Sequence, residues 1–218
     1  MMNDVPEPLL APFGKDDTTD DLLFYAPTRL VTHIDDAALS SLTAFYRSAL
    51  PRGGAILDLM SSWVGHLPPD LPTRETIGHG MNALELAANP RLDRWFIQDL
   101  NTSPALPLSD ASVDTSLCCV SVQYLQRPVE VFAEVHRVLR TGAPFGVSFS
   151  NRCFPKKSGP DLARARSEWP SGTRSGLFRT CRLYIDRGRS SQGRIGKRSA
   201  DRGYRSRLGG NPDGRHLC

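Results

Sequence analysis

Residues 55–60 have the sequence AILDLM, an apolar run that only Asp58 interrupts. A run of this length and composition is typical of a strand that is buried on both faces of a parallel sheet. A Pro-Arg-Gly-Gly turn precedes it, and before this turn the apolar residues of segment 35–50 recur at helical spacing, with Asp35 or Asp36 available as a cap. We therefore expect an amphipathic helix that leads into the first strand of a sheet.

The chain after this strand alternates between further strand patterns and helical patterns. Strands are expected at residues 73–78, 95–99, 113–120 and 143–149, and helices at residues 81–88 and 128–139. Asn89-Pro90 ends the first of these helices and Thr141-Gly142 ends the second. This alternation predicts the α/β class, with a parallel sheet that is covered by helices and connected by right-handed crossovers.

Ligands of such sheets bind outside the carboxyl ends of the strands, so the residues that follow each strand carry the functional information. Four motifs follow one another along the chain, two in or just after expected strands, one before the fourth strand and one in the last expected helix. They are Ile56-Leu57-Asp58-Leu59, Gln98-Asp99-Leu100, Leu106-Pro107-Leu108 before Ser112-Val113-Asp114, and Glu134-Val135-His136-Arg137-Val138-Leu139-Arg140. In this order and spacing they resemble class I S-adenosylmethionine-dependent methyltransferases of the methyltransferase type 11 kind, over about residues 30–155. The resemblance implies a Rossmann-like methyltransferase sheet and S-adenosyl-L-methionine as the cofactor.

Two aspartates match positions that contact the cofactor in this family. By the resemblance, Asp58 lies near the amino-acid portion of the cofactor, whose ammonium is a good partner for a carboxylate. Asp99 resembles the residue that accepts a hydrogen bond from the adenine amino group, and Leu100 the residue whose backbone N–H binds the ring. The alternatives are a strand-end cap for Asp58 and a turn cap for Asp99.

The chain departs from the family pattern in two loops. A glycine-rich turn commonly follows the first strand, whereas this chain has Met60-Ser61-Ser62-Trp63, so we expect a variant loop in which Ser61 and Ser62 offer hydroxyl and N–H groups to the cofactor. No acidic residue ends the second strand. Asn82, or the backbone around Gly80, is expected to hold the ribose hydroxyls instead, and Met81 either covers the adenine or fills the core.

The acceptor side is less specified by the sequence. Ser121, Gln123 and Tyr124 face the transfer site by analogy with the family, although each is also an ordinary polar residue at the edge of a core. No catalytic base is evident, and methyl transfer needs little beyond placing the nucleophile in line. The five histidines show no ligand spacing such as HxxxH, so no metal site is expected. A small-molecule acceptor is expected.

Charge divides the chain after Pro155. Residues 1–155 carry 11 Lys and Arg against 18 Asp and Glu, a net of −7, whereas residues 156–218 carry 16 against 5, a net of +11. The second part is also poor in apolar residues. We expect three regions: a lead at residues 1–29, the cofactor-binding domain at 30–155, and an Arg/Gly/Ser-rich tail at 156–218 that is disordered or translated from a shifted reading frame.

A tail of this composition implies that the sheet lacks the last two strands of the family, which leaves the fifth strand as an unprotected edge. Two functional alternatives to methyl transfer follow: a catalytically inactive remnant that still binds the cofactor, and a module that binds nucleic acid through the tail. The sequence contains no run of 18 apolar residues and no basic-then-apolar signal at the N-terminus. We therefore expect a cytoplasmic protein without a membrane partner.

Overall fold

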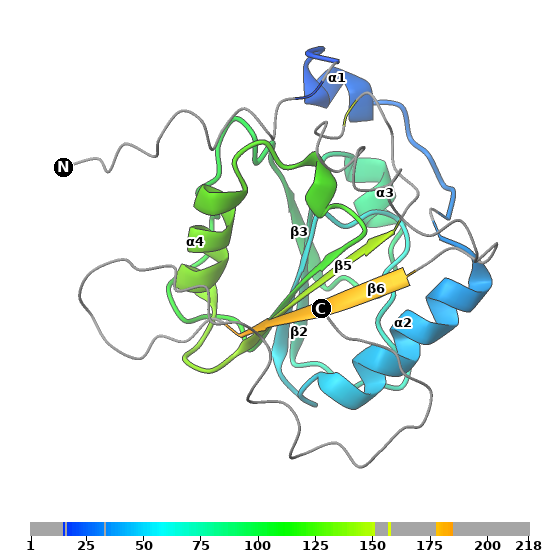
Figure 1. The fold of residues 1–218 in the computed structure, drawn as a ribbon, viewed down its shortest axis with the longest axis vertical. Coiled ribbons are helices and arrows are strands. Elements are labelled where there is room, and N and C mark those ends of the chain that lie inside the picture. The colour runs from blue at the N-terminus through cyan, green and yellow to red at the C-terminus, as the bar shows by residue number, and fades with distance from the viewer. Residues whose placement is uncertain (1–14, 16, 33, 151–156, 158–177, 185–218) are drawn as a thin grey trace.

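The computed structural model describes residues 15, 17–32, 34–150, 157 and 178–184 of the 218-residue chain. Six strands form one sheet in the order β3-β2-β1-β4-β5-β6 (Figure 1). The strands are β1 (Ala55–Leu59), β2 (Glu75–Gly80), β3 (Arg94–Ile97), β4 (Thr115–Cys119), β5 (Pro144–Ser150) and β6 (Phe178–Tyr184). The first five run parallel, and β6 pairs with β5 in the antiparallel direction.

The helices begin and end at the residues that favour such boundaries. They are α1 (Asp21–Tyr25), α2 (Asp36–Ala49), α3 (Ala83–Ala87) and α4 (Pro128–Val138), with a short 3₁₀ turn η3 at Val122–Tyr124. The Asp35 carboxylate caps α2 by accepting a hydrogen bond from Ala38 N at 2.9 Å, and Pro128 occupies the first turn of α4, where its missing N–H has no cost.

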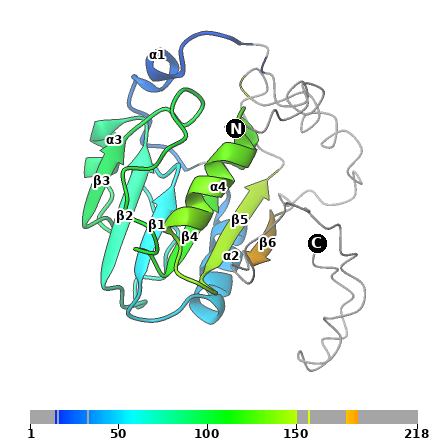
Figure 2. The ribbon, with the colours of Figure 1, turned by 90° about the vertical axis from the view of Figure 1, so that its left-hand side faces the viewer.

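Alternating side chains of the strands divide the core between the two faces of the sheet. Leu57 and Leu59 of β1 pack with Val131 and Val135 of α4, whereas Ile56 packs on the opposite face with helix α2. Figure 2 shows α4 in front of the sheet and α2 behind it. Successive side chains of β1 therefore contribute to the core on both faces of the sheet, as expected for a strand covered on both faces.

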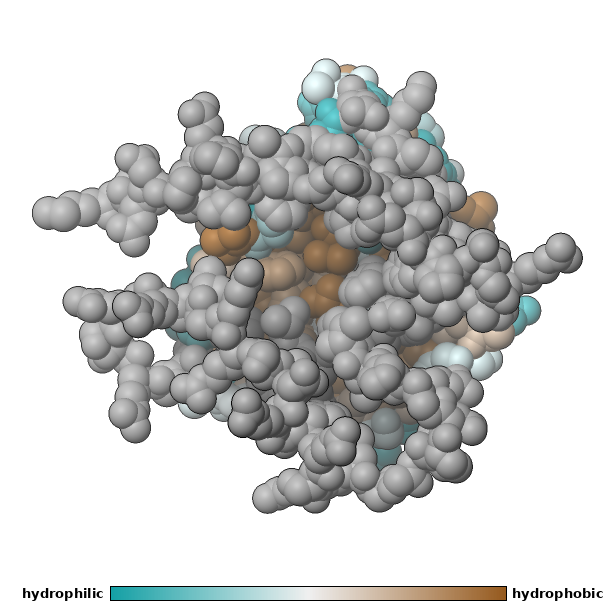
Figure 3. All heavy atoms as spheres, in the orientation of Figure 1, coloured by the Kyte–Doolittle hydropathy of each residue, from teal (hydrophilic) through white to brown (hydrophobic). Residues whose placement is uncertain are grey.

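Apolar surface is also visible from one side of the molecule. Figure 3 shows a brown, apolar area at the centre of the face that Figure 1 presents, between α4 and β5. The core cluster that α4 shares with the sheet includes Phe145 and Val147 of β5, with Phe132 of α4 packed against Phe145 at a ring separation of 5.2 Å. This part of the α4 layer holds the helix to the sheet.

The parallel sheet and its covering helices confirm the predicted fold class. Each of the five expected strands and three expected helices is present, with ends that shift by only a few residues. The prediction that both final strands are missing needs a correction, because residues 178–184 of the basic tail form β6 along the edge of β5. The edge that was expected to be open is therefore paired. The disorder or frame shift expected for the rest of the tail concerns residues outside the described ones, apart from Lys157.

The strand order places a topological switch between β1 and β4. From β1 the chain moves outward to β2 and β3, and it then returns to β4 on the other side of β1. The loops that follow β1 and β4 therefore diverge at the carboxyl end of the sheet. α1 lies above this end in Figure 2.

Candidate functional site

A pocket of about 420 Å³ lies at the carboxyl end of the sheet. Its walls come from the loops after β1, β2, β3 and β4 and from the segment that contains α1. All eight residues predicted to bind the cofactor line this pocket: Asp58, Ser61, Ser62, Gly80, Met81, Asn82, Asp99 and Leu100. A volume of this size is usual for sites that enclose a small organic ligand.

Asp58 is a carboxylate inside an otherwise apolar strand. It is 7% exposed, and Ser61 Oγ donates a hydrogen bond to its Oδ2 at 2.7 Å. Burial raises the pKa of Asp58 to about 6, against the smaller opposite effect of the Ser61 hydrogen bond. No cation is paired with this carboxylate among the described residues. The site therefore contains a buried acid that a positively charged ligand would stabilise.

The loops after β1 and β4 both turn through a left-handed residue that is not glycine. Met60 has φ +57° and Val120 has φ +45°. Ser61 N donates to His79 O at 2.6 Å, and Val120 N donates to Ser148 O at 2.8 Å, so each turn is tied to a neighbouring strand. Such conformations are unfavourable for side chains with a Cβ and cluster at functional sites. The loop after β1 is thus a variant turn, in agreement with the missing glycines.

Glu85 of α3 supplies a second carboxylate that the sequence analysis missed. Its Oε2 accepts a hydrogen bond from Ser62 Oγ at 2.5 Å, and its Oε1 accepts one from Arg29 N at 2.7 Å. Glu85 therefore joins the loop after β1 to the N-terminal segment while it lines the pocket. It is the first acidic residue after β2, and this position was the available signal.

Asn82 forms hydrogen bonds with backbone groups of two neighbouring segments. Its Oδ1 caps α3 by accepting from Leu84 N and Glu85 N, and its Nδ2 donates to the carbonyls of Tyr25 and Ala26, both at 3.0 Å. Both amide hydrogens are used, so a ribose hydroxyl would have to displace one of these bonds. Asn82 anchors the C-terminal end of α1, and Glu85 presents a carboxylate to the same pocket. Gly80 matters for packing, because a Cβ there would lie 2.6 Å from Ser61 O.

The turn after β3 is organised by Asp99. Its two carboxylate oxygens accept hydrogen bonds from Asn101 N at 2.9 Å and Thr102 Oγ1 at 2.6 Å, as expected of a turn cap. Asp99 and Leu100 both line the pocket nonetheless. A carboxylate accepts up to about four hydrogen bonds, so the cap leaves capacity for a ligand.

Only two of the three acceptor-side candidates line the pocket. Ser121 and Tyr124 line the pocket, whereas Gln123 is only 5% exposed and its Nε2 donates to Val120 O at 2.7 Å. Gln123 thus holds the turn after β4 instead of facing the cavity. Ser121 Oγ is within donating distance of Cys119 O at 2.7 Å and of Met60 O at 3.2 Å. Its hydroxyl links the loops after β1 and β4.

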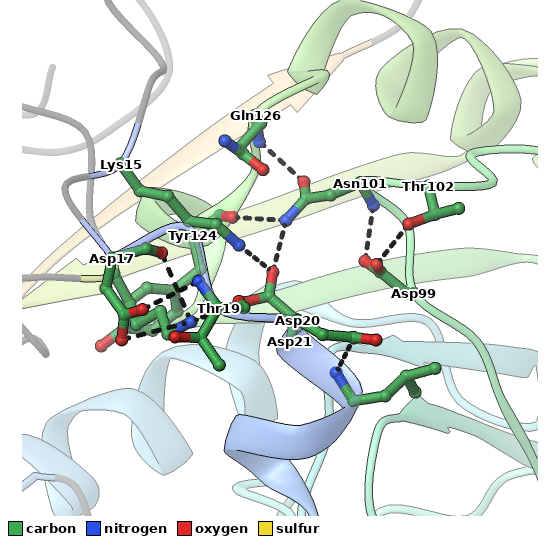
Figure 4. A network of polar contacts seen from close by, with 12 residues as sticks. Lys15, Asp17, Thr19, Asp20, Asp21, Asp99, Asn101, Thr102, Tyr124 and Gln126 are labelled. Carbon is green, nitrogen blue, oxygen red and sulfur yellow. Dashed lines mark hydrogen bonds and ion pairs between the residues drawn. The ribbon is translucent and has the colours of Figure 1, made fainter.

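The segment that contains α1 closes one side of the pocket through a buried ion pair. Lys157 and Asp21 are 2% and 7% exposed and lie 3.2 Å apart, and Lys15 Nζ is 2.5 Å from the same carboxylate. Asn101 Nδ2 also donates to Asp21 at 3.1 Å, which connects α1 to the turn after β3 (Figure 4). Burial would raise the pKa of Asp21, but these hydrogen bonds and charges together lower it. Asp21 is therefore ionised, and it ties the segment to the sheet.

Several lining residues were not anticipated from the sequence. Besides Glu85 they include Asp21, Tyr25, Arg29, His79 and Asn101. The first three lie in a segment whose composition gave no indication of a role, and only the tertiary structure brings it to the sheet. In the described part of the chain, no group of His, Cys, Asp and Glu is arranged to hold a metal ion, and no helix is long and apolar enough to cross a membrane.

Residues 80–146 match the model of a known family, described as the methyltransferase domain. This region contains most of the pocket-forming turns after β2, β3 and β4. No curated protein matches the chain. The matched region runs from the last residue of β2 through β3, β4 and α4 into β5.

Solved structures of similar fold include several methyltransferases. An S-adenosylmethionine-dependent methyltransferase from Mesorhizobium loti is 22% identical, with 49% of this chain and 52% of that chain covered and a TM-score of 0.39. The YcgJ protein from Bacillus subtilis is 20% identical, with 51% and 50% covered and a TM-score of 0.44. The match therefore spans about half the length of each of these structures.

Proposed function

We propose that the pocket of this chain binds S-adenosyl-L-methionine and that the protein transfers the methyl group to a small-molecule acceptor. The match of residues 80–146 to the methyltransferase domain supports this proposal. The observation that carries the proposal is the convergence of Asp58, Ser61, Asp99 and Leu100 on one cavity at the carboxyl end of the sheet. These residues come from two different strand ends, and each matches a family position or its expected substitute.

The charge of the pocket fits this cofactor. Asp21, Asp58, Glu85 and Asp99 line it together with Arg29, so its carboxylates outnumber its guanidinium groups. The cofactor is a cation with an ammonium, two ribose hydroxyls and an adenine amino group, all of which a carboxylate can bind. When bound, it supplies an electrophilic methyl group on a sulfonium.

Three carboxylates divide the binding work in this proposal. Asp58 accepts the ammonium, and its pKa of about 6 leaves it ionised at neutral pH. Glu85, held by Ser62 and by Arg29 N, accepts the ribose hydroxyls. Asp99 accepts the adenine amino group while Leu100 offers its backbone beside it, and the apolar side chains of Met60 and Met81 cover the remaining wall.

The acceptor is positioned by the loop after β4. Ser121 and Tyr124 line the pocket on this side, and orientation of a nucleophile in line with the methyl group supplies much of the catalysis in such a transfer. The proposed location of the protein is the cytoplasm. The free thiols of Cys118 and Cys119 support a reducing compartment.

The test is isothermal titration of S-adenosylhomocysteine into the purified full chain and into its Asp99→Ala variant. We expect micromolar binding by the unchanged chain and at least about 10-fold weaker binding by the variant, since the carboxylate is the adenine acceptor. Asp70→Ala is the matched control, because Asp70 forms an exposed surface pair with Arg47 and its loss leaves binding unchanged. Folded protein that does not bind would contradict the proposal.

A further inference from the structure

His79 occupies the middle of three adjacent strand ends and contacts both neighbours. It lies on β2, between β1 and β3 in the sheet. Met60 N donates a hydrogen bond to His79 Nδ1 at 3.1 Å, and His79 Nε2 lies 2.9 Å from Gln98 O. Since a carbonyl only accepts, Nε2 carries the proton and Nδ1 is the acceptor. One tautomer of one side chain satisfies both bonds.

The two backbone groups that His79 contacts belong to the turns that carry the proposed cofactor-binding residues. Met60 is the left-handed residue between Asp58 and Ser61, and Gln98 immediately precedes Asp99. Without glycine, the turn at Met60 needs support from its surroundings to keep this conformation. The bond from Met60 N to the imidazole provides that support from the side of β2.

The environment of His79 keeps the ring neutral and in place. The side chain is 1% exposed, and its ring lies 5.2 Å from that of Phe96. Burial lowers the pKa of His79 to about 4 despite the opposite effect of its hydrogen bond to Gln98. A neutral ring can accept and donate at once, which the protonated ring cannot, because a proton on Nδ1 would face the N–H of Met60.

We propose that His79 is a positioning residue of the cofactor site, whose imidazole sets the loop at residues 60–62 against the turn at residues 98–99. This inference rests on the proposed function. His79 acts through the backbone, so the cofactor affinity depends on the hydrogen-bonding pattern of this side chain and not only on its volume. An ordinary core histidine would affect stability without this dependence.

Three substitutions separate the two hydrogen bonds. His79→Asn can place a carbonyl oxygen near the position of Nδ1 and keep the bond from Met60 N, whereas His79→Gln reaches toward Gln98 O. His79→Phe fills the space and keeps neither bond. We expect S-adenosylhomocysteine to bind about 10-fold or more weakly to His79→Phe and His79→Gln, because the Met60 N–H loses its partner, and within about 3-fold of normal to His79→Asn.

Val135→Ala is the control for a general loss of stability, since Val135 is a fully buried residue of α4 in the core cluster on that face of the sheet. It should lower the melting temperature and leave the affinity unchanged. Equal affinity of His79→Phe and the unchanged chain would overturn the inference, and so would a loss in His79→Asn as large as that in His79→Phe.

A second measurement keeps this inference distinct from the proposed function. Nitrogen-15 spectra of the imidazole should show a protonated Nε2 and an unprotonated Nδ1, and the Met60 amide should be protected from exchange in the unchanged chain and in His79→Asn but not in His79→Phe. Absence of binding by the unchanged chain would refute the proposed function alone. The opposite tautomer, or a Met60 amide that stays protected in His79→Phe, would refute the positioning role of His79.

Discussion

At the scale of single residues, the site depends on carboxylates placed where the fold itself does not favour a charge. Asp58 is the clearest case, because a buried aspartate without a cation has to be stabilised by something other than the core. Ser61 is its hydrogen-bond donor. The sequence already showed this conflict as one acidic residue in an apolar strand, and in the structure that residue lines the pocket.

Replacement of Asp58 by Asn should therefore stabilise the protein and weaken cofactor binding. The pKa of Asp58 is raised from 3.8 to about 6 in the folded chain, so the folded state binds the proton more tightly than the unfolded state. The unfolding free energy of the unchanged chain then falls as the pH rises from about 4 to about 6. We expect Asp58→Asn to be more stable by about 1–3 kcal/mol at pH 8, with no difference below pH 4.

Urea unfolding at both pH values measures this difference, and titration with S-adenosylhomocysteine measures the loss of affinity. Ser116→Ala on the neighbouring strand is a control for polar groups of the sheet that lie outside the pocket lining. Equal stability of Asp58→Asn and the unchanged chain at pH 8 would mean that the folded chain already compensates the charge.

Substitution of Asn82 distinguishes a structural role, as an anchor for α1, from a role in ligand binding. An Asn82→Asp change keeps an oxygen to cap α3 but removes both N–H donors to the carbonyls of Tyr25 and Ala26. We expect faster hydrogen exchange of the amides at residues 21–26, with little change in the α3 cap. Asp35→Asn, a similar change at the cap of α2, should leave those amides protected. Unaltered exchange at residues 21–26 in Asn82→Asp would contradict the anchoring role.

At the scale of elements, the family motifs have a structural explanation that differs from catalysis. Arg137 of α4 donates to the carbonyls of Leu106 and Leu108, while Glu134 accepts from Leu106 N. The Leu-Pro-Leu turn and the Glu-x-x-Arg helix thus form one clamp, which holds the crossing from β3 to β4. In the same way, Asp114 joins Ala55 N at the start of β1 to Arg140, two residues after α4.

Loss of this clamp should lower stability more than loss of an ordinary surface ion pair. We expect Arg137→Ala to lower the unfolding free energy by about 2 kcal/mol, because two carbonyls and the Glu134 carboxylate lose a charged donor. Arg137→Lys should not restore it, since an ammonium lacks the fork that contacts several acceptors at once. Chemical denaturation measures both.

Arg47→Ala is the matched control for the Arg137 substitutions, because Arg47 and Asp70 form a pair whose side chains are 47% and 58% exposed. This change should cost less than about 1 kcal/mol. A similar cost for Arg47→Ala and Arg137→Ala would show that the clamp contributes no more than a surface pair.

At the scale of the whole molecule, β6 changes the expectation for the edge of the sheet. Its seven residue pairs with β5 cover the strand that would otherwise present unpaired N–H and C=O groups. We expect proline in β6 to expose this edge and to cause association of the chain. Adjacent N–H groups of a strand point in opposite directions, so only one of Thr180→Pro and Cys181→Pro should remove a bond to β5.

Sedimentation at two protein concentrations distinguishes these variants. The proline substitution that removes the bond should increase the associated fraction, whereas the other proline variant and the matched alanine variants should behave like the unchanged chain. A monomeric state of both proline variants would indicate that β6 is not needed to protect β5.

The sequence by itself determined which segments form the five parallel strands and their helices along the chain, because hydrophobic periodicity and turn residues are local properties. It also placed Asp58, Asp99 and Leu100 correctly at strand ends. Only the tertiary structure decided that the Asn82 side chain donates to the carbonyls at the end of α1, that Glu85 and His79 line the pocket, and that residues 178–184 pair with β5. Each of these depends on contacts between segments far apart in the chain, which no local pattern encodes.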